Sequence, residues 1–256
     1  MANWNDNRTQ AGLGVSPSQT GDVTGRTTFD AGLRKHMLSI YNYMASGVLL
    51  TGIVALLTAR SGLAVQFASG PLMWLVALSP LAIVFAMSFG RNKFSTTTLQ
   101  MMFWGFAVLM GLSLSTIFLV YTGASIATTF FATAAAFAGL SLFGYTTQKD
   151  LSGWGSFLIM GVIGLLVAMV LNFFLQNPAL MYAISFIGVL IFAGLTAYDT
   201  QRLKQEYLMV QQAKLTNPSV AASYPVGKMV ILGALTLYLD FINMFLFLLQ
   251  FMGNRE

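Results

Sequence analysis

The stretch MVILGALTLYLDFINMFLFLLQF, residues 229–251, decides the fold class of this chain. Its length matches the roughly 20 residues that an α-helix needs to cross a hydrocarbon core of about 30 Å. A single acid, Asp240, interrupts the apolar run near its middle. Because backbone N–H and C=O groups cannot stay unpaired in lipid, such a segment predicts a membrane-spanning helix and not an open strand.

Six further apolar segments of similar length precede this one along the chain. Together they predict an all-α integral membrane protein with seven transmembrane helices. The six segments lie at about 39–59, 71–89, 99–121, 124–145, 155–175 and 179–199.

The overall composition also indicates that lipid surrounds most of the chain. Hydrophobic residues make up 56% of the chain and charged residues 8%, whereas a globular protein carries about 25% charge. Residues 31–256 are therefore predicted to form one membrane domain. Residues 1–30 are polar and too poor in apolar side chains to form a core, so they are predicted to be a disordered cytoplasmic tail.

The positions of the basic residues predict the orientation in the membrane. With seven spans and a cytoplasmic N-terminus, all of the 13 lysines and arginines except Arg60 and Arg255 fall on the cytoplasmic side. The alternative is that the last segment, with an acid at its middle, enters the membrane and returns. In that case both termini would lie in the cytoplasm.

The residue inventory excludes several classes of function. The chain has no cysteine, which rules out disulfides, iron–sulfur clusters, thiolate zinc and a cysteine nucleophile. Neither a glycine-rich phosphate loop nor a nucleophile–base constellation occurs, so we expect no enzyme activity and no cofactor. The basic residues are scattered, which argues against nucleic-acid binding. The single histidine, His36, follows Arg34 and Lys35 and is predicted to lie at the membrane interface.

Asp240 is the most informative residue of the last segment. An isolated ionised carboxylate at that depth costs at least about 2.5–3.5 kcal/mol, so it must face protein or water, find a partner or hold a proton. Polar and small residues recur around it with three- and four-residue spacing, which predicts a stripe that faces the bundle interior. This stripe consists of Gly233, Thr236, Asp240, Asn243, Phe247 and Gln250.

A second stripe in the 179–199 segment ends on another acid. If the two stripes face each other, Asp199 and Asp240 could share one proton or, when both are ionised, bind a hard cation such as calcium. The alternatives are that Asp240 only bonds to neighbouring polar side chains and that Asp199 only pairs with Arg202. Asp199 also lies several residues shallower than Asp240. The second stripe consists of Ser185, Gly188, Phe192, Thr196 and Asp199.

Two other features have weaker implications. Arg91 ends the second segment, where it is either a cytoplasmic anchor or a counter-charge that reaches an acid. Small residues four apart in the fourth segment favour close helix packing there, namely Ala132 with Ala136 and Ala135 with Gly139.

Four stretches resemble the Bax inhibitor-1 family, also called the transmembrane Bax inhibitor motif family. The two most specific are AYDTQRLK at 197–204 and GALTLYLDFINMFLFLL at 233–249. GLSLSTIFLVYT at 111–122 and FGYTTQKDLSGWG at 143–155 resemble its bacterial branch. The resemblance covers roughly residues 30–256. The segment 205–228, between the two main motifs, departs from the family pattern.

The resemblance implies a fold and a function. The last helix would be central, surrounded by the other six. The function would be a pH-sensitive calcium leak in the bacterial inner membrane, gated by protonation of an aspartate pair that maps onto Asp199 and Asp240. A gating arginine maps only loosely onto Arg91. The alternative is an interaction protein that modulates a membrane protease or stress-response machinery; for the leak, the expected partners are the bilayer, calcium ions and protons.

Overall fold

The structure, a computed structural model, describes residues 18–68, 72–216 and 225–254 and is helical in nearly all of them. Side chains are described from residue 31 onward. The helices are α1 (Ser18–Arg60), α2 (Leu63–Ala68), α3 (Leu72–Gly90), α4 (Thr96–Leu114), the 3₁₀ helix η1 (Ser115–Leu119), α5 (Gly123–Thr146), α6 (Ser152–Leu175), α7 (Pro178–Thr216) and α9 (Val226–Met252).

Seven helical runs in the described residues are long and apolar enough to cross a membrane, which confirms the predicted architecture. The helix α4 and η1 together form one such run, Thr96–Leu119. The largest difference from the predicted spans is in α7, which continues beyond residue 199 to Thr216. At the other end of the chain, α1 begins at Ser18 and so extends into the range predicted to be disordered; residues 1–17 lie outside the described residues.

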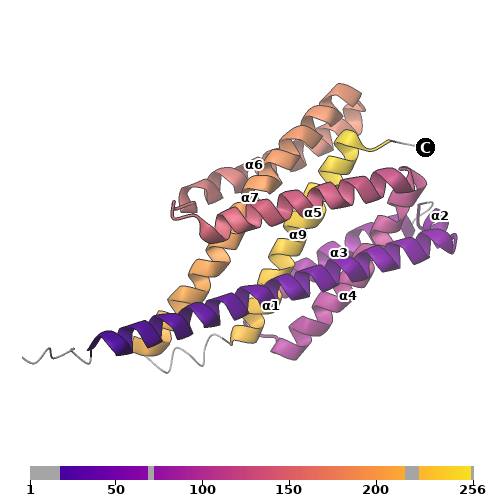
Figure 1. Cartoon of the computed structure of the whole chain (residues 1–256). Coiled ribbons are helices and arrows are strands. Elements are labelled where there is room, and N and C mark those ends of the chain that lie inside the picture. Colours follow the sequence, from indigo (N-terminus) through magenta and orange to yellow (C-terminus); the bar gives the residue numbers. More distant parts are fainter. Residues whose placement is uncertain (1–17, 69–71, 217–224, 255–256) are drawn as a thin grey trace, which may run out of the picture.

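The last helix, α9, is the central element of the bundle. In its most apolar window 72% of the residues are buried, against 11% in the corresponding windows of α3 and α6. It packs against α7, α1, α5 and α4. Figure 1 shows α9 in yellow, passing between α5 and α7 on one side and α1 and α4 on the other. The central position implied by the family resemblance is therefore confirmed.

The helix α9 crosses the bundle once and does not return. It is continuous from Val226 to Met252, which at 1.5 Å per residue spans about 40 Å. The residues after it reach the start of α5, where the Asn254 carbonyl accepts a hydrogen bond from Thr122 N–H and the Asn254 N–H donates to Ser125 Oγ. The alternative of a re-entrant last segment is therefore wrong.

The helices α5 and α7 approach each other closely at Gly144. A Cβ built on Gly144 would lie 2.2 Å from the carbonyl oxygen of Ala197, so only glycine fits this crossing. The small residues for which close packing was predicted lie elsewhere on α5. Ala132, Ala136, Ala135 and Gly139 are all exposed. That prediction was wrong because four-residue spacing identifies a smooth helix face but not the face that a neighbour covers.

A buried hydroxyl contact joins α1 to α4 and α9. The Thr51 hydroxyl donates to the Ala107 carbonyl at 2.8 Å and lies 2.7 Å from the Tyr238 hydroxyl. Both Thr51 and Tyr238 are almost completely buried. Because Thr51 Oγ1 has one hydrogen and donates it to Ala107, Tyr238 must be the donor of the second bond.

The contact gives a prediction about stability. We expect Thr51→Val to destabilise the protein by about 0.6–1.7 kcal/mol, between the average and the maximum measured for interhelical hydrogen bonds in membranes, because it leaves the Tyr238 hydroxyl without an acceptor. The double variant Thr51→Val/Tyr238→Phe should lose less than the sum of the two single variants. The free energy of unfolding in detergent is measured for the unmodified chain, the two single variants and the double variant. If the loss of stability in the double variant equalled the sum of the losses in the two single variants, the contact between Thr51 and Tyr238 would be contradicted.

His36 is buried between two helices. It lies on α1 with 4% of its surface exposed, and its ring stacks on Tyr207 of α7 with ring centroids 4.5 Å apart. The neighbouring side chains of Arg34 and Lys35 are exposed, whereas His36 points between the helices, so its depth at the membrane interface stays a prediction. The contact with Tyr207 was not predicted, because α7 continues past the predicted end of its span and carries Tyr207 to this position.

Candidate functional site

Asp199 and Asp240 lie together at the crossing of α7 and α9. Their carboxyl groups are within hydrogen-bonding reach of each other. Both residues are buried, with 7% and 4% of their surfaces exposed. The apparent difference in depth disappears because α7 does not end at Asp199: the helix continues for several turns, so Asp199 lies inside the bundle and not at its edge.

The pair is short of hydrogen-bond donors. Among the described residues, Asp240 Oδ2 is buried without any hydrogen-bond partner. Two carboxylates in contact offer only acceptors to each other, so the contact is favourable only with a proton or a cation between them. An unpartnered buried polar atom of this kind marks either a stored free-energy cost or a place where a proton or ion binds.

Asp199 also contacts a cation from its own helix. Arg202 Nη1 lies 3.7 Å from Asp199 Oδ1, and the arginine side chain is 59% exposed whereas that of the aspartate is 9% exposed. The predicted salt bridge therefore exists beside the contact with Asp240. Asp199 thus lies between an exposed cation and a buried acid, and Asp240 forms no ion pair with any of the described residues.

The two predicted stripes meet along the whole α7–α9 seam. At the end far from Arg202, the Ser185 hydroxyl donates to Gln250 Oε1 at 2.6 Å. Between that bond and the aspartates, the rings of Phe192 and Phe247 stack with centroids 5.8 Å apart. The three-four spacing thus predicted correctly which faces of the two helices are in contact.

The polar residues expected to support the aspartates bond to their own helices instead. The Thr196 hydroxyl donates to Phe192 O at 2.8 Å, and the Thr236 hydroxyl donates to Leu232 O at 3.2 Å. The Asn243 side-chain amide donates to Leu239 O at 2.8 Å. Among the described residues, none of these three side chains forms a hydrogen bond with Asp199 or Asp240.

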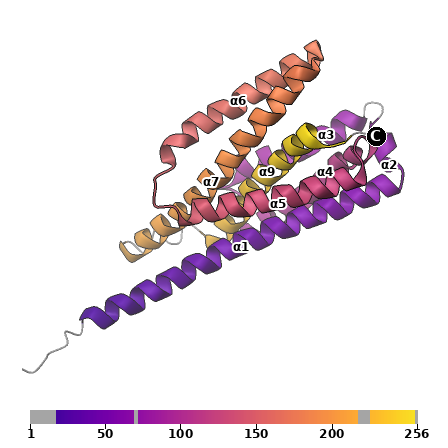
Figure 2. The ribbon, with the colours of Figure 1, turned by 45° about the horizontal axis from the view of Figure 1, so that its top comes forward.

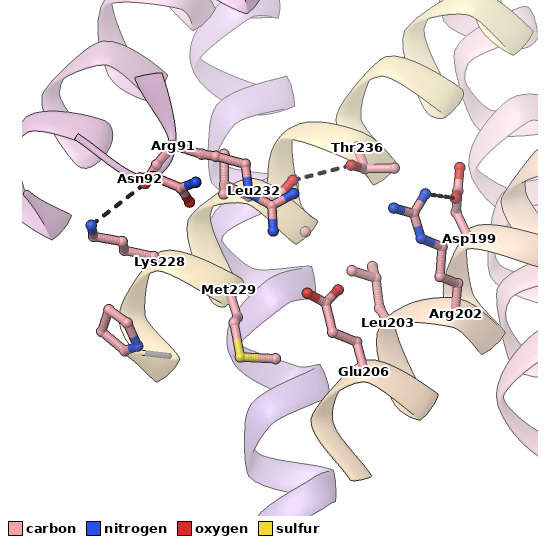
Figure 3. A pocket seen from close by; sticks show the side chains of 12 residues that line it. Arg91, Asn92, Asp199, Arg202, Leu203, Glu206, Lys228, Met229, Leu232 and Thr236 are labelled. Atoms are coloured by element: carbon pink, nitrogen blue, oxygen red, sulfur yellow. Dashed lines mark hydrogen bonds and ion pairs between the residues drawn. The ribbon is translucent and has the colours of Figure 1, made fainter. Parts of the chain in front are cut away.

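A polar cavity of about 280 Å³ opens beside the pair, between the residues that follow α3, the middle of α7 and the first turns of α9. Asp199 lines it, whereas Asp240 lies deeper. Figure 3 shows side chains of both charges that project into it from opposite walls. The lining residues are Arg91, Asn92, Asp199, Arg202, Leu203, Glu206, Pro225, Lys228, Met229, Leu232, Gly233 and Thr236.

Arg91 faces this cavity without an ionic contact to the pair. No ion pair joins it to either aspartate in the described part of the chain, and its backbone carbonyl accepts a hydrogen bond from Lys228 Nζ at 3.5 Å. The predicted counter-charge is thus in the right cavity but is not paired with an acid there. In Figure 3 its guanidinium is on the opposite side of the cavity from the carboxylate of Glu206.

Glu206 is the cavity residue that the sequence reasoning missed. It follows Asp199 by seven residues, or about two helical turns, so both acids lie on the same face of α7. The signal was present, but the predicted span ended at residue 199, and the segment after it was treated as a connection. Within the described residues, no group of three or more His, Asp or Glu side chains could hold a metal ion, so two carboxylates alone would provide a weak site.

Comparison with known proteins finds one matching family and several bacterial relatives that cover most of the chain. The profile of the family described as "Inhibitor of apoptosis-promoting Bax1" matches residues 33–256. An uncharacterized protein of Caulobacter vibrioides is 47% identical over 89% of this chain and 92% of its own length. The Escherichia coli inner membrane protein YbhL is 46% identical over 88% of this chain and 94% of its own. A Rickettsia prowazekii protein, RP147, is 45% identical over 90% and 93%.

Proposed function

Because the chain belongs to the Bax inhibitor-1 family of multi-pass membrane proteins, we propose that it is a pH-sensitive calcium leak of the bacterial inner membrane. The ion would be bound, and its passage gated, by the aspartates of α7 and α9. Protons and calcium would compete for this pair. The bacterial membrane is proposed from the similarity to YbhL, which is named as an inner membrane protein.

The observation that carries this proposal is the unpartnered Oδ2 of Asp240, buried against a second carboxyl group. A purely structural aspartate would be expected to have donors directed at it, as most buried polar atoms do. One proton satisfies the pair and removes its affinity for a cation. Loss of that proton leaves two ionised carboxylates, for which a divalent cation is the natural counter-ion.

The surroundings of the pair suggest how such a leak would be kept closed. The cavity admits water and ions to Asp199 from the end of the bundle that carries Arg91, Arg202 and Lys228. Beyond the pair, about two helical turns further along each helix, the stacked and buried rings of Phe192 and Phe247 fill the seam. An ion would therefore pass only when α7 and α9 separate at these rings.

The direct test is calcium efflux from liposomes that contain the purified full chain. We expect the rate to exceed that of protein-free liposomes and to change by up to about tenfold per pH unit near the point where one proton binds. Potassium-loaded liposomes in parallel report selectivity for divalent ions. An efflux rate equal to that of protein-free liposomes from pH 5 to pH 9 would overturn the proposal.

A further inference from the structure

A lateral apolar groove runs along the seam between α1 and α5. Two cavities, of about 510 and 330 Å³, follow each other along this seam. Figures 1 and 2 both show α5 running alongside α1, with α9 crossing behind α5. The larger cavity is lined by Arg34, Met37, Leu38 and Tyr41 of α1 and by Phe137, Ala138, Ser141, Leu142 and Tyr145 of α5.

The floor of the groove is aromatic and is shared by the central helix and α5. Phe241 of α9 packs edge-to-face against Phe137 and Phe130 of α5, with ring centroids 5.6 Å apart in both pairs. Phe130 and Phe241 line the smaller cavity, and Phe137 lines the larger one. The groove therefore lies within the transmembrane part of the bundle, where hydrocarbon is the surrounding solvent.

One end of the groove is basic. Arg34 lines it there and forms no ion pair with any residue that the structure describes. Lys204 of α7 reaches the same end, because its ammonium donates to the Tyr145 carbonyl at 2.7 Å and lies 5.2 Å from the Tyr145 ring centroid. An apolar slot that ends at a guanidinium with no ion pair among the described residues is complementary to a molecule with a long hydrocarbon chain and an anionic head.

A hydrogen bond limits what can occupy the groove. The hydroxyls of Tyr41 and Ser141 lie 2.6 Å apart and join α1 to α5 across the larger cavity. A helix from another protein, about 10 Å in diameter, would have to break this bond and separate the two helices, whereas an extended acyl chain is narrow enough to pass over it. The volume of the larger cavity also lies within the range typical of small-ligand sites.

We propose that the α1–α5 groove is a binding site for an anionic phospholipid. One acyl chain lies on the floor formed by Phe137 and Phe241, and the phosphate is held by Arg34. Through Ser141 the site also contacts α7, because the Ser141 hydroxyl is 2.9 Å from that of Thr200, the residue that follows Asp199. Lipid in the groove would therefore contact the hydroxyl chain that positions the helix of the proposed ion site.

The test measures lipid retention on the purified full chain by native mass spectrometry. The probes are dioleoylphosphatidylglycerol and dioleoylphosphatidylcholine, which have the same chains and differ in net charge. We expect a preference for the anionic lipid of about fivefold, the effect of one basic side chain near a membrane surface. Arg34→Gln should abolish this preference, whereas Lys35→Gln, a change of an exposed neighbour outside the groove, should keep it.

A second pair of variants tests the apolar slot. Ala138→Trp fills the larger cavity and should abolish retention of both lipids, whereas Ala136→Trp, on the opposite face of α5 and equally exposed, should retain both. Equal retention of the two lipids by the unmodified chain, equal losses from Arg34→Gln and Lys35→Gln, or equal retention by the two tryptophan variants would each overturn the proposal. Because the readout is bound lipid, a failure of the calcium-efflux test leaves this result unaffected.

Discussion

Replacing Asp240 with Asn is expected to remove the pH dependence of calcium efflux and to lower the efflux rate at alkaline pH by about tenfold or more. The amide is nearly isosteric with the carboxyl group, so the packing of α9 should persist. It cannot lose a proton to become an anion, so Asp199 is left as the only carboxylate at the crossing. The charge of that carboxylate is already balanced by Arg202, so it would bind a divalent cation only weakly.

The matched control for Asp240→Asn is Asp150→Asn. Asp150 is an exposed acid between α5 and α6, where the hydroxyl and N–H of Ser152 donate to it and hold its pKa below the usual value. The control changes the net charge by the same amount outside the membrane, so its efflux profile should match that of the unmodified chain. Retention of pH dependence in Asp240→Asn would show that the aspartate crossing is not the proton-sensitive site.

The variant Asp199→Asn tests whether the two acids act as a pair. It removes the acid that contacts both Arg202 and Asp240 and leaves Asp240 the only acid of the pair, in a fully buried position. The expected result is again loss of pH dependence, measured over the same pH range. If only one of the two asparagine variants lost it, the acids would act independently and not as a pair.

The number and type of the helices could be predicted from the sequence because each apolar run has the length that the membrane requires. The true extent of α7 could not. Hydropathy falls at Asp199, where the residues become polar, but the helix continues because nothing in 200–216 breaks it. Apolar length thus marks the part of a helix in lipid and not the helix itself. For the same reason the stacking of His36 could not be predicted, since its partner Tyr207 lies on the extension.

The aspartate crossing was predictable because both acids lie on stripes with helical spacing, and two inward stripes on neighbouring helices meet. The contacts around the crossing were not. The link from Tyr41 through Ser141 to Thr200 joins three helices, and no pattern within a single helix encodes it. The exposed small residues of α5, such as Ala135 and Gly139, show the converse: a regular pattern exists, yet no helix covers it.

Gly144→Ala is expected to be the most disruptive single-methyl change in the bundle. The added Cβ would lie 2.2 Å from the backbone oxygen of Ala197, and a backbone atom in the middle of α7 cannot rotate away as a side chain can. Overpacking of this kind costs about 1–3 kcal/mol when neighbours can adjust, and here α5 and α7 must separate. Thermal unfolding in detergent should therefore show a clear drop in the midpoint.

Gly139→Ala on the same helix is the control for Gly144→Ala. Apart from its chain neighbours and the backbone of its own helix, no atom of the described residues lies within 4 Å of the position its Cβ would take. This variant should therefore unfold at the same temperature or slightly above, because alanine favours helix more than glycine does. Since Ala197 is two residues from Asp199, separation of α5 from α7 should also move that carboxyl group, and the efflux profile of Gly144→Ala should shift whereas that of Gly139→Ala should not. Equal midpoints for the two variants would mean that α5 and α7 do not approach this closely, and the position of Asp199 would then depend on α9 alone.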